Sequence, residues 1–255
     1  MNDDDQTWLA GVDGCRGGWV VVFCRFGQRK DAIVEVRQNF SDIIMDPRAP
    51  AVIAVDMPIG LPDHCSRGGR AAEREVRDKL GQRRSSVFST PSRRAVYAYE
   101  QGYENVCAIA RQTSDPGPWA PSKQAFHIFK RIIQIDRALR ENRDAERRVY
   151  EVHPELSFAL MNSAPLNEPK PLAEPKKKRG RLHEAGLAAR HDLLLEQGFS
   201  TDFLNAPPPR GAARDDFYDA CATLWSAARI HARCDRAFPS VPECDAMGLP
   251  MAIRA

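Results

Sequence analysis

Two apolar stretches near the start of the chain, residues 8–13 and 19–26, flank a glycine-rich turn at residues 14–18. Because glycine adopts backbone dihedrals that other residues resist, this pattern predicts two strands joined by a tight connection. Asp13 lies where the first strand meets the turn. A carboxylate there is costly to desolvate unless it is hydrogen-bonded, paired or coordinating a cation. Asp-Gly is also common turn chemistry, so other parts of the chain have to decide the role of Asp13.

A second aspartate ends the next buried-type strand. Residues 32–36 add a third strand after a short turn, which makes an antiparallel meander. Ser41 can cap a short helix, and the continuous apolar run 51–56 then ends in Asp56. A helix between strands three and four is a crossover, so we expect the fourth strand to lie beside the first and parallel to it. Asp13 and Asp56 would then end neighbouring strands at the same edge of a sheet.

The length and composition fit one α/β domain, residues 1–255, with a sizeable core. No apolar run approaches the roughly 20 residues of a membrane helix, so no membrane partner is expected. The acidic N-terminus lacks the features of a signal peptide, which favours a cytoplasmic location. The seven cysteines form no Cys-x-x-Cys pair, which argues against a disulfide framework and a structural zinc site.

The net charge of +3 hides two basic segments. Residues 63–94 carry nine Lys/Arg against four Asp/Glu, and residues 170–181 carry six against one, so each segment has a local charge of +5. The rest of the chain is therefore acidic. Basic segments on an acidic protein predict a polyanionic partner, such as nucleic acid or another phosphate-rich ligand, although charge can also serve solubility alone.

Residues 63–121 are expected to form an insertion that is helical at first and looser later. At about 100° per residue, arginines 67, 70, 74 and 77 share one face, and apolar residues 72, 76 and 80 share the opposite one. Forked guanidiniums with nearby hydroxyls suit phosphate oxygens, though surface helices also carry arginines for solubility. The predicted substrate-binding residues, here and in other basic parts of the chain, are Arg16, Arg67, Arg70, Arg74, Arg84, Ser85, Ser86, Lys123 and Lys177.

The second half of the chain supplies further carboxylates. A helix is expected from Ser122, and residues 148–153 indicate a fifth strand with Glu151 at its end. Glu155 opens a short helix directly afterwards, and alternation over so few residues does not tell which glutamate faces the sheet edge. His153 is a candidate proton carrier or phosphate contact, although a lone histidine is more often structural.

The C-terminal part is expected to hold a basic loop, two helices and a tail. Residues 163–181 are rich in proline and lysine and cannot bury a core. Residues 182–197 are helical. The last strong helix carries Asp216 and Asp219, which are neighbours on its surface, although the helix dipole also favours acidic residues in a first turn. Residues 239–255 are expected to form an irregular tail.

Several carboxylates gathered in one cleft would repel each other unless cations held them together. Oxygen-only ligands select hard ions, so Mg²⁺ or Mn²⁺ is the expected cofactor. Two such ions roughly 3.5–4 Å apart can activate water and stabilise the leaving oxygen of a phosphodiester. The candidate catalytic residues are Asp13, Asp56, Asp216, Asp219, Glu151, Glu155 and His153, and the four aspartates are the candidate metal ligands.

Six motifs in fixed order carry a resemblance to a known family. They are GVDGCRGGW at residues 11–19, VDMPIG at 55–60, RSSVF at 84–88, SKQ at 122–124, EVHPELSF at 151–158 and DDFYDA at 215–220. Together they resemble a domain-of-unknown-function family described as predicted RNase H-like nucleases, over most of residues 8–232. The resemblance implies an RNase H-like α/β fold. Its mixed five-stranded sheet has an antiparallel meander of strands 1–3 and parallel strands 4 and 5, flanked by helices and here carrying the arginine-rich insertion.

The acidic C-terminal helix adds a second resemblance. Its Asp216-x-x-Asp219 pattern is similar to that of RuvC-type Holliday-junction resolvases, whose metal ligands lie on the first strand, after the fourth strand and on the last helix. By position, this resemblance makes Asp13 the bridging ligand of two metals and Asp56 the second-strand ligand, with Asp216 and Asp219 completing the site. It implies a divalent-metal-dependent nuclease that hydrolyses phosphodiester bonds in nucleic acid.

Two other functions are compatible with the same sequence. An actin- or sugar-kinase-like nucleotide hydrolase or phosphotransferase resembles the same fold, but such proteins have Ser/Thr-rich phosphate loops where this chain has Cys15 and Arg16. A non-catalytic nucleic-acid-binding protein would bind in a salt-sensitive way without metal-dependent turnover. The sequence leaves DNA, RNA, branched and small-nucleotide substrates open, and the oligomeric state as well, a homodimer included.

Overall fold

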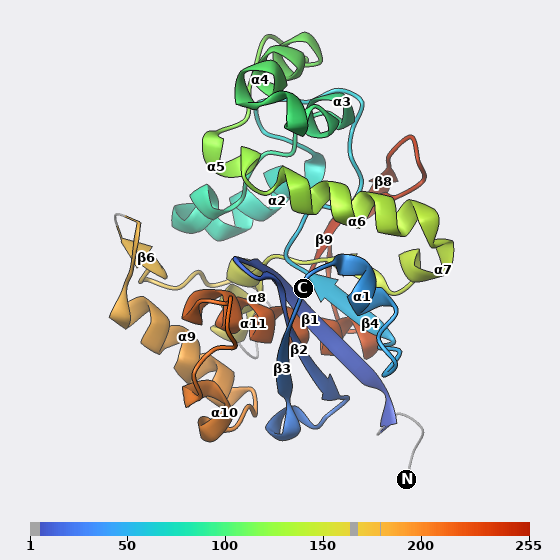
Figure 1. Ribbon diagram of the computed structural model, residues 1–255. Helices are drawn as coiled ribbons and strands as arrows, with labels where there is room; N and C mark the ends of the chain where they lie inside the picture. The colour runs from blue at the N-terminus through green and yellow to red at the C-terminus, as the bar shows by residue number, and fades with distance from the viewer. Residues whose placement is uncertain (1–5, 164–167, 179) are drawn as a thin grey trace.

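A five-stranded mixed sheet forms the centre of the molecule (Figure 1). The computed structural model describes residues 6–163, 168–178 and 180–255. Strands β1 (Trp8–Cys15), β2 (Gly18–Arg25) and β3 (Ile33–Arg37) pair antiparallel, and β4 (Val52–Val55) and β5 (Val149–Glu151) continue the sheet in parallel. The strand order is β3-β2-β1-β4-β5, which confirms the predicted mixed sheet with its meander and two parallel strands.

The crossover from β3 to β4 runs through the short helix α1 (Phe40–Ile44). The residue that caps this helix is Asn39 rather than Ser41, and its backbone N–H donates to the Asp42 carboxylate at 3.2 Å. Because the crossover returns the chain beside β1, the Asp56 backbone N–H donates to the Val12 carbonyl at 2.9 Å. The carboxyl ends of β1 and β4 therefore lie side by side.

Helices cover both faces of the sheet, so its inner strands β1, β2 and β4 are mostly apolar and buried. One face packs against α8 (Pro154–Met161), α9 (Glu184–Glu196) and α11 (Arg214–His231), and the other packs against α1 and α6 (Phe129–Glu141). Alternate residues of β1 point into the cores on the two faces: Leu9 packs on the side of α8, α9 and α11, and Ala10 packs on the side of α1 and α6. Burial on both faces accounts for the continuous apolar runs in the sequence.

The approach of α11 to β1 is unusually close at Gly11. A Cβ atom at this position would lie 2.1 Å from the Leu224 backbone nitrogen and 2.3 Å from the Ala220 carbonyl oxygen. These distances are too short for any side chain, so only glycine allows the two backbones to touch. This contact brings the start of α11 to the end of β1, where Asp13 lies.

A group of helices lies between β4 and β5, over the carboxyl ends of β1 and β4 (top of Figure 1). We call residues 63–146 the helical lobe. The second half of the predicted insertion 63–121 is not loose, because it contains two helices. The lobe consists of α2 (Ala71–Leu80), the 3-10 helix η3 (Gly81–Ser86), α3 (Arg93–Tyr97), η4 (Tyr99–Gln101), α4 (Tyr103–Gln112), α5 (Lys123–Phe126), α6 and α7 (Arg143–Glu146).

The basic region 163–181 contains a short hairpin, β6 (Lys177–Lys178) and β7 (Arg181–Leu182). Residues 164–167 and 179 of the predicted basic loop lie outside the described residues. The chain then enters α9 and the short helix α10 (Thr201–Asn205) before it reaches α11.

The C-terminal tail is structured, which corrects the expectation for residues 239–255. Strands β8 (Ala237–Cys244) and β9 (Pro250–Arg254) form an antiparallel hairpin with a register shift between Phe238 and Glu243. Leu249, Met251 and Ile253 are buried, so the hairpin contributes to the core. Among the described residues, no helix combines the length and apolarity needed to cross a membrane.

Candidate metal centre

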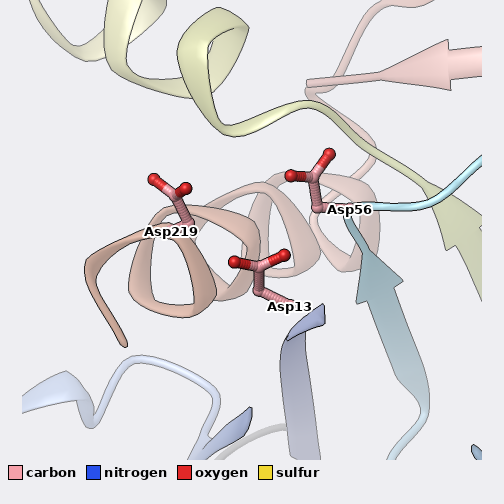
Figure 2. Close-up of side chains that lie close together, drawn as sticks. All are labelled: Asp13, Asp56 and Asp219. Atoms are coloured by element: carbon pink, nitrogen blue, oxygen red, sulfur yellow. The ribbon is translucent and has the colours of Figure 1, made fainter. Parts of the chain in front are cut away.

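Three aspartates from distant parts of the chain meet at the carboxyl edge of the sheet. Asp13 lies on β1, Asp56 directly follows β4, and Asp219 lies on α11. One carboxylate oxygen from each lies within 4.8 Å of the others, and Figure 2 shows the three side chains close together, with their carboxylates extending in the same general direction. The prediction that Asp13, Asp56 and Asp219 lie close together is therefore confirmed.

Backbone contacts hold the first two aspartates in place. The Gly14 backbone N–H donates to Asp13 Oδ1 at 2.7 Å, so the turn uses one of the two oxygens. Asp56 is placed by its backbone bond to the Val12 carbonyl. Asp219 is positioned by the contact of α11 with Gly11, since Ala220 lies against that glycine. Asp13 and Asp219 thus lie on a strand and a helix, and Asp56 directly follows a strand.

Burial and repulsion raise the pKa values of this group. Burial is the largest cause for each carboxyl, and repulsion by Asp219 adds to it for both Asp13 and Asp56. The pKa of Asp56 rises to about 8 and that of Asp219 to about 6, while that of Asp13 lies well above its ordinary value. Close carboxylates with raised pKa values need a positive charge nearby to ionise together.

One positive charge comes from Lys176, whose Nζ contacts Asp219 Oδ2 directly. Burial alone would lower the pKa of this lysine, but Asp219, Asp13 and Asp56 outweigh it and hold the pKa above its ordinary value. We call residues 174–178 the lysine segment. Its backbone closes against α9, because the Pro175 carbonyl oxygen lies only 2.0 Å from where a Cβ of Gly186 would be.

The two candidate glutamates have different partners. Glu151 is buried, and its oxygens accept from Arg70 Nη2 at 2.6 Å and from the Ile59 backbone N–H at 2.7 Å. Burial raises its pKa to about 7 against the opposing effect of Arg70. Glu155 accepts from Arg190 Nη2 at 2.5 Å and raises the pKa of Asp56 and Asp219. Both glutamates are thus neighbours of the aspartates: Glu151 also raises the pKa of Asp56 and lines a cavity with Asp13 and Asp56, while it anchors Arg70.

His153 lines the same cavity as Asp13 and Asp56, a space of about 140 Å³ under Phe88. Its Nε2 lies 3.4 Å from the Ser86 carbonyl oxygen. Burial lowers the pKa of the imidazole to about 4, so it is neutral at pH 7. His153 therefore faces the site without adding charge to it.

Asp216, the fourth predicted metal ligand, lies outside the group of three. Its Oδ2 accepts from the Ala213 backbone N–H at 3.0 Å, which caps the first turn of α11. It lies close enough to raise the pKa of Asp13. The neighbouring Asp215 is buried and forms an ion pair with Lys177 at 2.6 Å.

The predicted phosphate-binding residues lie in several different parts of the structure. Arg67, Arg74, Arg84 and Ser85 line one groove on the helical lobe, and Ser86 lines the cavity beside Asp13. Arg70 does not belong to an exposed arginine face, which corrects the helical-wheel expectation, because it is buried between Glu73 and Glu151. The others are exposed, namely Arg16 in the β1–β2 turn, Lys123 on α5 and Lys177 beside Asp215.

Sequence reasoning missed several residues that shape the site. Lys176 was one of four consecutive cations, and nothing in the run marks the one that points inward. Arg131 lies over Gly14 and donates to the Cys15 carbonyl, yet in the sequence it is one polar residue on an amphipathic helix. Arg190 is an isolated arginine in the middle of α9. No local pattern distinguishes these three.

One of the three comparisons with known proteins found a match. No curated protein and no solved structure matched the chain. The model of a family described as Protein of unknown function (DUF429) matches residues 11–244, a span that contains most of β1, the helical lobe, α11 and all three clustered aspartates. The chain therefore belongs to the DUF429 family.

Proposed function

We propose that this protein is a divalent-metal-dependent nuclease with an RNase H-like fold. The observation that carries the proposal is the meeting of Asp13, Asp56 and Asp219, with carboxylate oxygens within 4.8 Å of one another. The order of the elements supports it as well. A meander, a crossover helix, a parallel fourth strand and an acidic last helix follow one another as they do in the RNase H-like and RuvC-type enzymes that the sequence resembles.

The charge of the site favours a divalent cation. Lys176 offsets one of the three aspartates, and Arg190 offsets Glu155, so two negative charges stay uncompensated when all are ionised. Asp219 Oδ1 is buried and has no hydrogen-bond partner among the described residues. An unpartnered buried oxygen is costly unless a ligand uses it. The oxygen-only donor set suits Mg²⁺ or Mn²⁺.

Asp13, Asp56 and Asp219 would hold the metal. When bound, it supplies water activation and stabilises charge on the leaving oxygen. In the reaction, a water oxygen attacks phosphorus, the bond to the leaving oxygen breaks, and that oxygen takes up a proton. Lys176 keeps Asp219 ionised, and the neutral His153 lines the same cavity. The two-metal mechanism expected from the sequence requires the Lys176 ammonium to leave Asp219.

The helical lobe supports nucleic acid as the substrate. Arg67, Arg74 and Arg84 line a groove next to the metal centre, and a run of phosphates matches such a series of guanidiniums. The turn after β1 carries Cys15 and Arg16 and offers no hydroxyl to a nucleotide phosphate. Phosphodiester hydrolysis therefore fits the site better than phosphoryl transfer from a nucleotide.

The test replaces ligands without changing side-chain size. We expect Asp13→Asn and Asp219→Asn each to weaken Mn²⁺ binding at least about 10-fold and to lower cleavage of a labelled oligonucleotide at least about 100-fold. Binding is measured by calorimetric titration and cleavage on a gel. Asp13→Asn should melt no lower than wild type, because it removes a repelling group, and circular dichroism checks that Asp219→Asn, which leaves Lys176 without its ion-pair partner, is folded.

Asp202→Asn is the matched control, since Asp202 is exposed on α10, a helix at the opposite end of the molecule from the helical lobe (Figure 1). It should bind metal and cleave like wild type. If folded Asp13→Asn and Asp219→Asn proteins both retain metal binding and cleavage, the proposed function is wrong.

A further inference from the structure

A groove of about 1050 Å³ opens on the helical lobe, outside the metal centre. Helix α2 and η3 contribute three of its lining arginines, and Arg67, just before α2, is the fourth. A second stretch contributes aromatic and polar residues, among them Tyr103, Trp119 and Ser122. The lining arginines are Arg67, Arg74, Arg77 and Arg84. The groove thus combines guanidiniums from one part of the chain with aromatic rings from another.

The groove adjoins the candidate metal centre. Val87 and Phe88 line both the groove and the cavity that is lined by Asp13 and Asp56. A ligand that fills the groove therefore lies next to that cavity, with these two residues between them. A free mononucleotide would fill only part of such a space, since pockets of small molecules measure about 300–1,000 Å³ in total.

The charge of the groove is available to a ligand. Arg67 and Arg84 are exposed, and their guanidiniums make no hydrogen bond or ion pair with the described residues. Arg77 has a different role, because it donates to the Val87 carbonyl and to Ser89 Oγ and so shapes the wall. Asp78 is the single acidic residue among those that line the groove. The surplus of positive charge matches a phosphate backbone.

The aromatic lining distinguishes between forms of nucleic acid. A double helix keeps its bases stacked inside and offers phosphates and groove edges, so it gains nothing from aromatic rings. Proteins that bind single strands combine a basic groove with aromatic side chains on which bases stack. Trp119 and Tyr103 are both half-buried, so each leaves part of its ring accessible in the groove.

We propose that this groove binds single-stranded nucleic acid and leads it to the metal centre. Arg67, Arg74 and Arg84 contact the phosphates, and bases stack on Trp119 and Tyr103. Which end of the groove leads to the reaction rests on the proposed nuclease function, because the strand would be cut beside the carboxylates. Binding itself needs no metal and is measured without turnover.

The test measures fluorescence anisotropy of full-length protein in EDTA with labelled oligomers of about 15 nucleotides. The probes are oligo-dT, oligo-rU and a DNA duplex of equal length. We expect both single strands, or one of them, to bind at least about 10-fold more tightly than the duplex. If oligo-dT binds with the higher affinity, the groove is a DNA site, and if oligo-rU does, it is an RNA site.

Variants then assign the binding to the groove. Trp119→Ala should weaken binding about 5- to 100-fold, and Trp119→Phe, which retains a ring and the packing of the lobe, should stay within about 3-fold of wild type. Arg67→Gln and Arg84→Gln should each weaken binding several-fold and reduce the slope of log K against log salt by about 0.7. Arg94→Gln removes an exposed arginine of α3 that does not line the groove, and it should have no effect.

The outcomes separate this inference from the proposed function. Preferential duplex binding, or unchanged single-strand affinity in both folded Arg67→Gln and Arg84→Gln, overturns the inference. Single-strand binding that depends on the groove, together with no cleavage in Mn²⁺, supports the inference and contradicts the nuclease. Cleavage by wild type with normal binding by all groove variants supports the nuclease and overturns the inference.

Discussion

At neutral pH, Asp56 retains a proton that an aspartate in an unfolded chain has already lost. Its pKa is about 8 in the folded protein, because of burial and repulsion by Asp219, against about 3.9 in an unfolded chain. Below the lower value the group is protonated in both states, and above the higher one it is ionised in both. Between them the folded state binds the extra proton, so the free energy of unfolding falls as pH rises.

We therefore expect the melting temperature of the metal-free protein to fall between about pH 5 and pH 8. Glu151 and Asp219 add to the effect, since their pKa values rise to about 7 and about 6. Asp56→Asn should reduce the slope, because it removes one of the titrating groups. Mn²⁺ should raise the melting temperature more at pH 8 than at pH 5, since only ionised carboxylates bind it. A pH-independent melting temperature in scanning calorimetry would contradict this assignment.

The lysine segment acts as a unit at the scale of secondary-structure elements. It is fixed to α9 by the close contact at Gly186 and by the hydrogen bond from Arg190 to the Glu174 carbonyl at 3.2 Å. From that base it directs Lys176 toward Asp219 and Lys177 toward Asp215. The same Arg190 holds Glu155, so α9 positions both the Glu155 carboxylate and the Lys176 ammonium beside the three clustered aspartates.

Lys176→Met should bind Mn²⁺ about 10-fold more tightly than wild type at about pH 8, because it removes an ammonium that competes for the same carboxylate. Calorimetric titration gives the affinity and the number of ions. Lys178→Met is the matched control, since Lys178 belongs to the same segment but pairs with the exposed carboxylate of Glu174 at 2.8 Å. Unchanged or weaker metal binding by Lys176→Met would show that the lysine does not compete.

The elements around the site differ in how far the sequence predicts them. The sheet was predictable because buried strands need continuous apolar residues, and the helix before Asp56 allows a parallel return. Arg70 was misplaced because a helical wheel gives a face but not its neighbour, and Glu151 on a strand about 80 residues away turns that face inward. The β8–β9 hairpin was missed because β8 contains Pro239 and Pro242 and is mostly exposed. Contacts between distant segments determine each of these exceptions.

On the scale of the whole molecule, Asp245 connects parts that are far apart in the sequence. It lies between β8 and β9, and its Oδ2 accepts from Arg93 Nη2 at 2.7 Å and from the Leu61 backbone N–H at 2.8 Å. Arg93 also donates to Asp136 on α6 at 2.7 Å. One buried carboxylate thereby joins the C-terminal hairpin, the loop after β4 and the helical lobe.

Asp245→Ala should lower the free energy of unfolding by about 3 kcal/mol, because it leaves the Leu61 N–H and half of the Arg93 pair without a partner. Urea unfolding followed by circular dichroism measures the change. Glu243→Ala, an exposed carboxylate on the same hairpin, should stay within about 0.5 kcal/mol of wild type. Equal midpoints for the two variants would mean that the hairpin does not hold the lobe to the sheet.

The backbone contact at Gly11 means that the group of carboxylates forms during folding rather than when a ligand binds. With no side chain at Gly11, the backbones of β1 and α11 pack directly against each other, and Asp13 and Asp219 lie close together in the folded chain without any ligand. The unfavourable free energy of holding the carboxylates close together is therefore offset by the favourable free energy of folding. Under the proposed function, the metal ion then binds to carboxylates that are already in place, and little of its binding free energy is lost to ordering the protein.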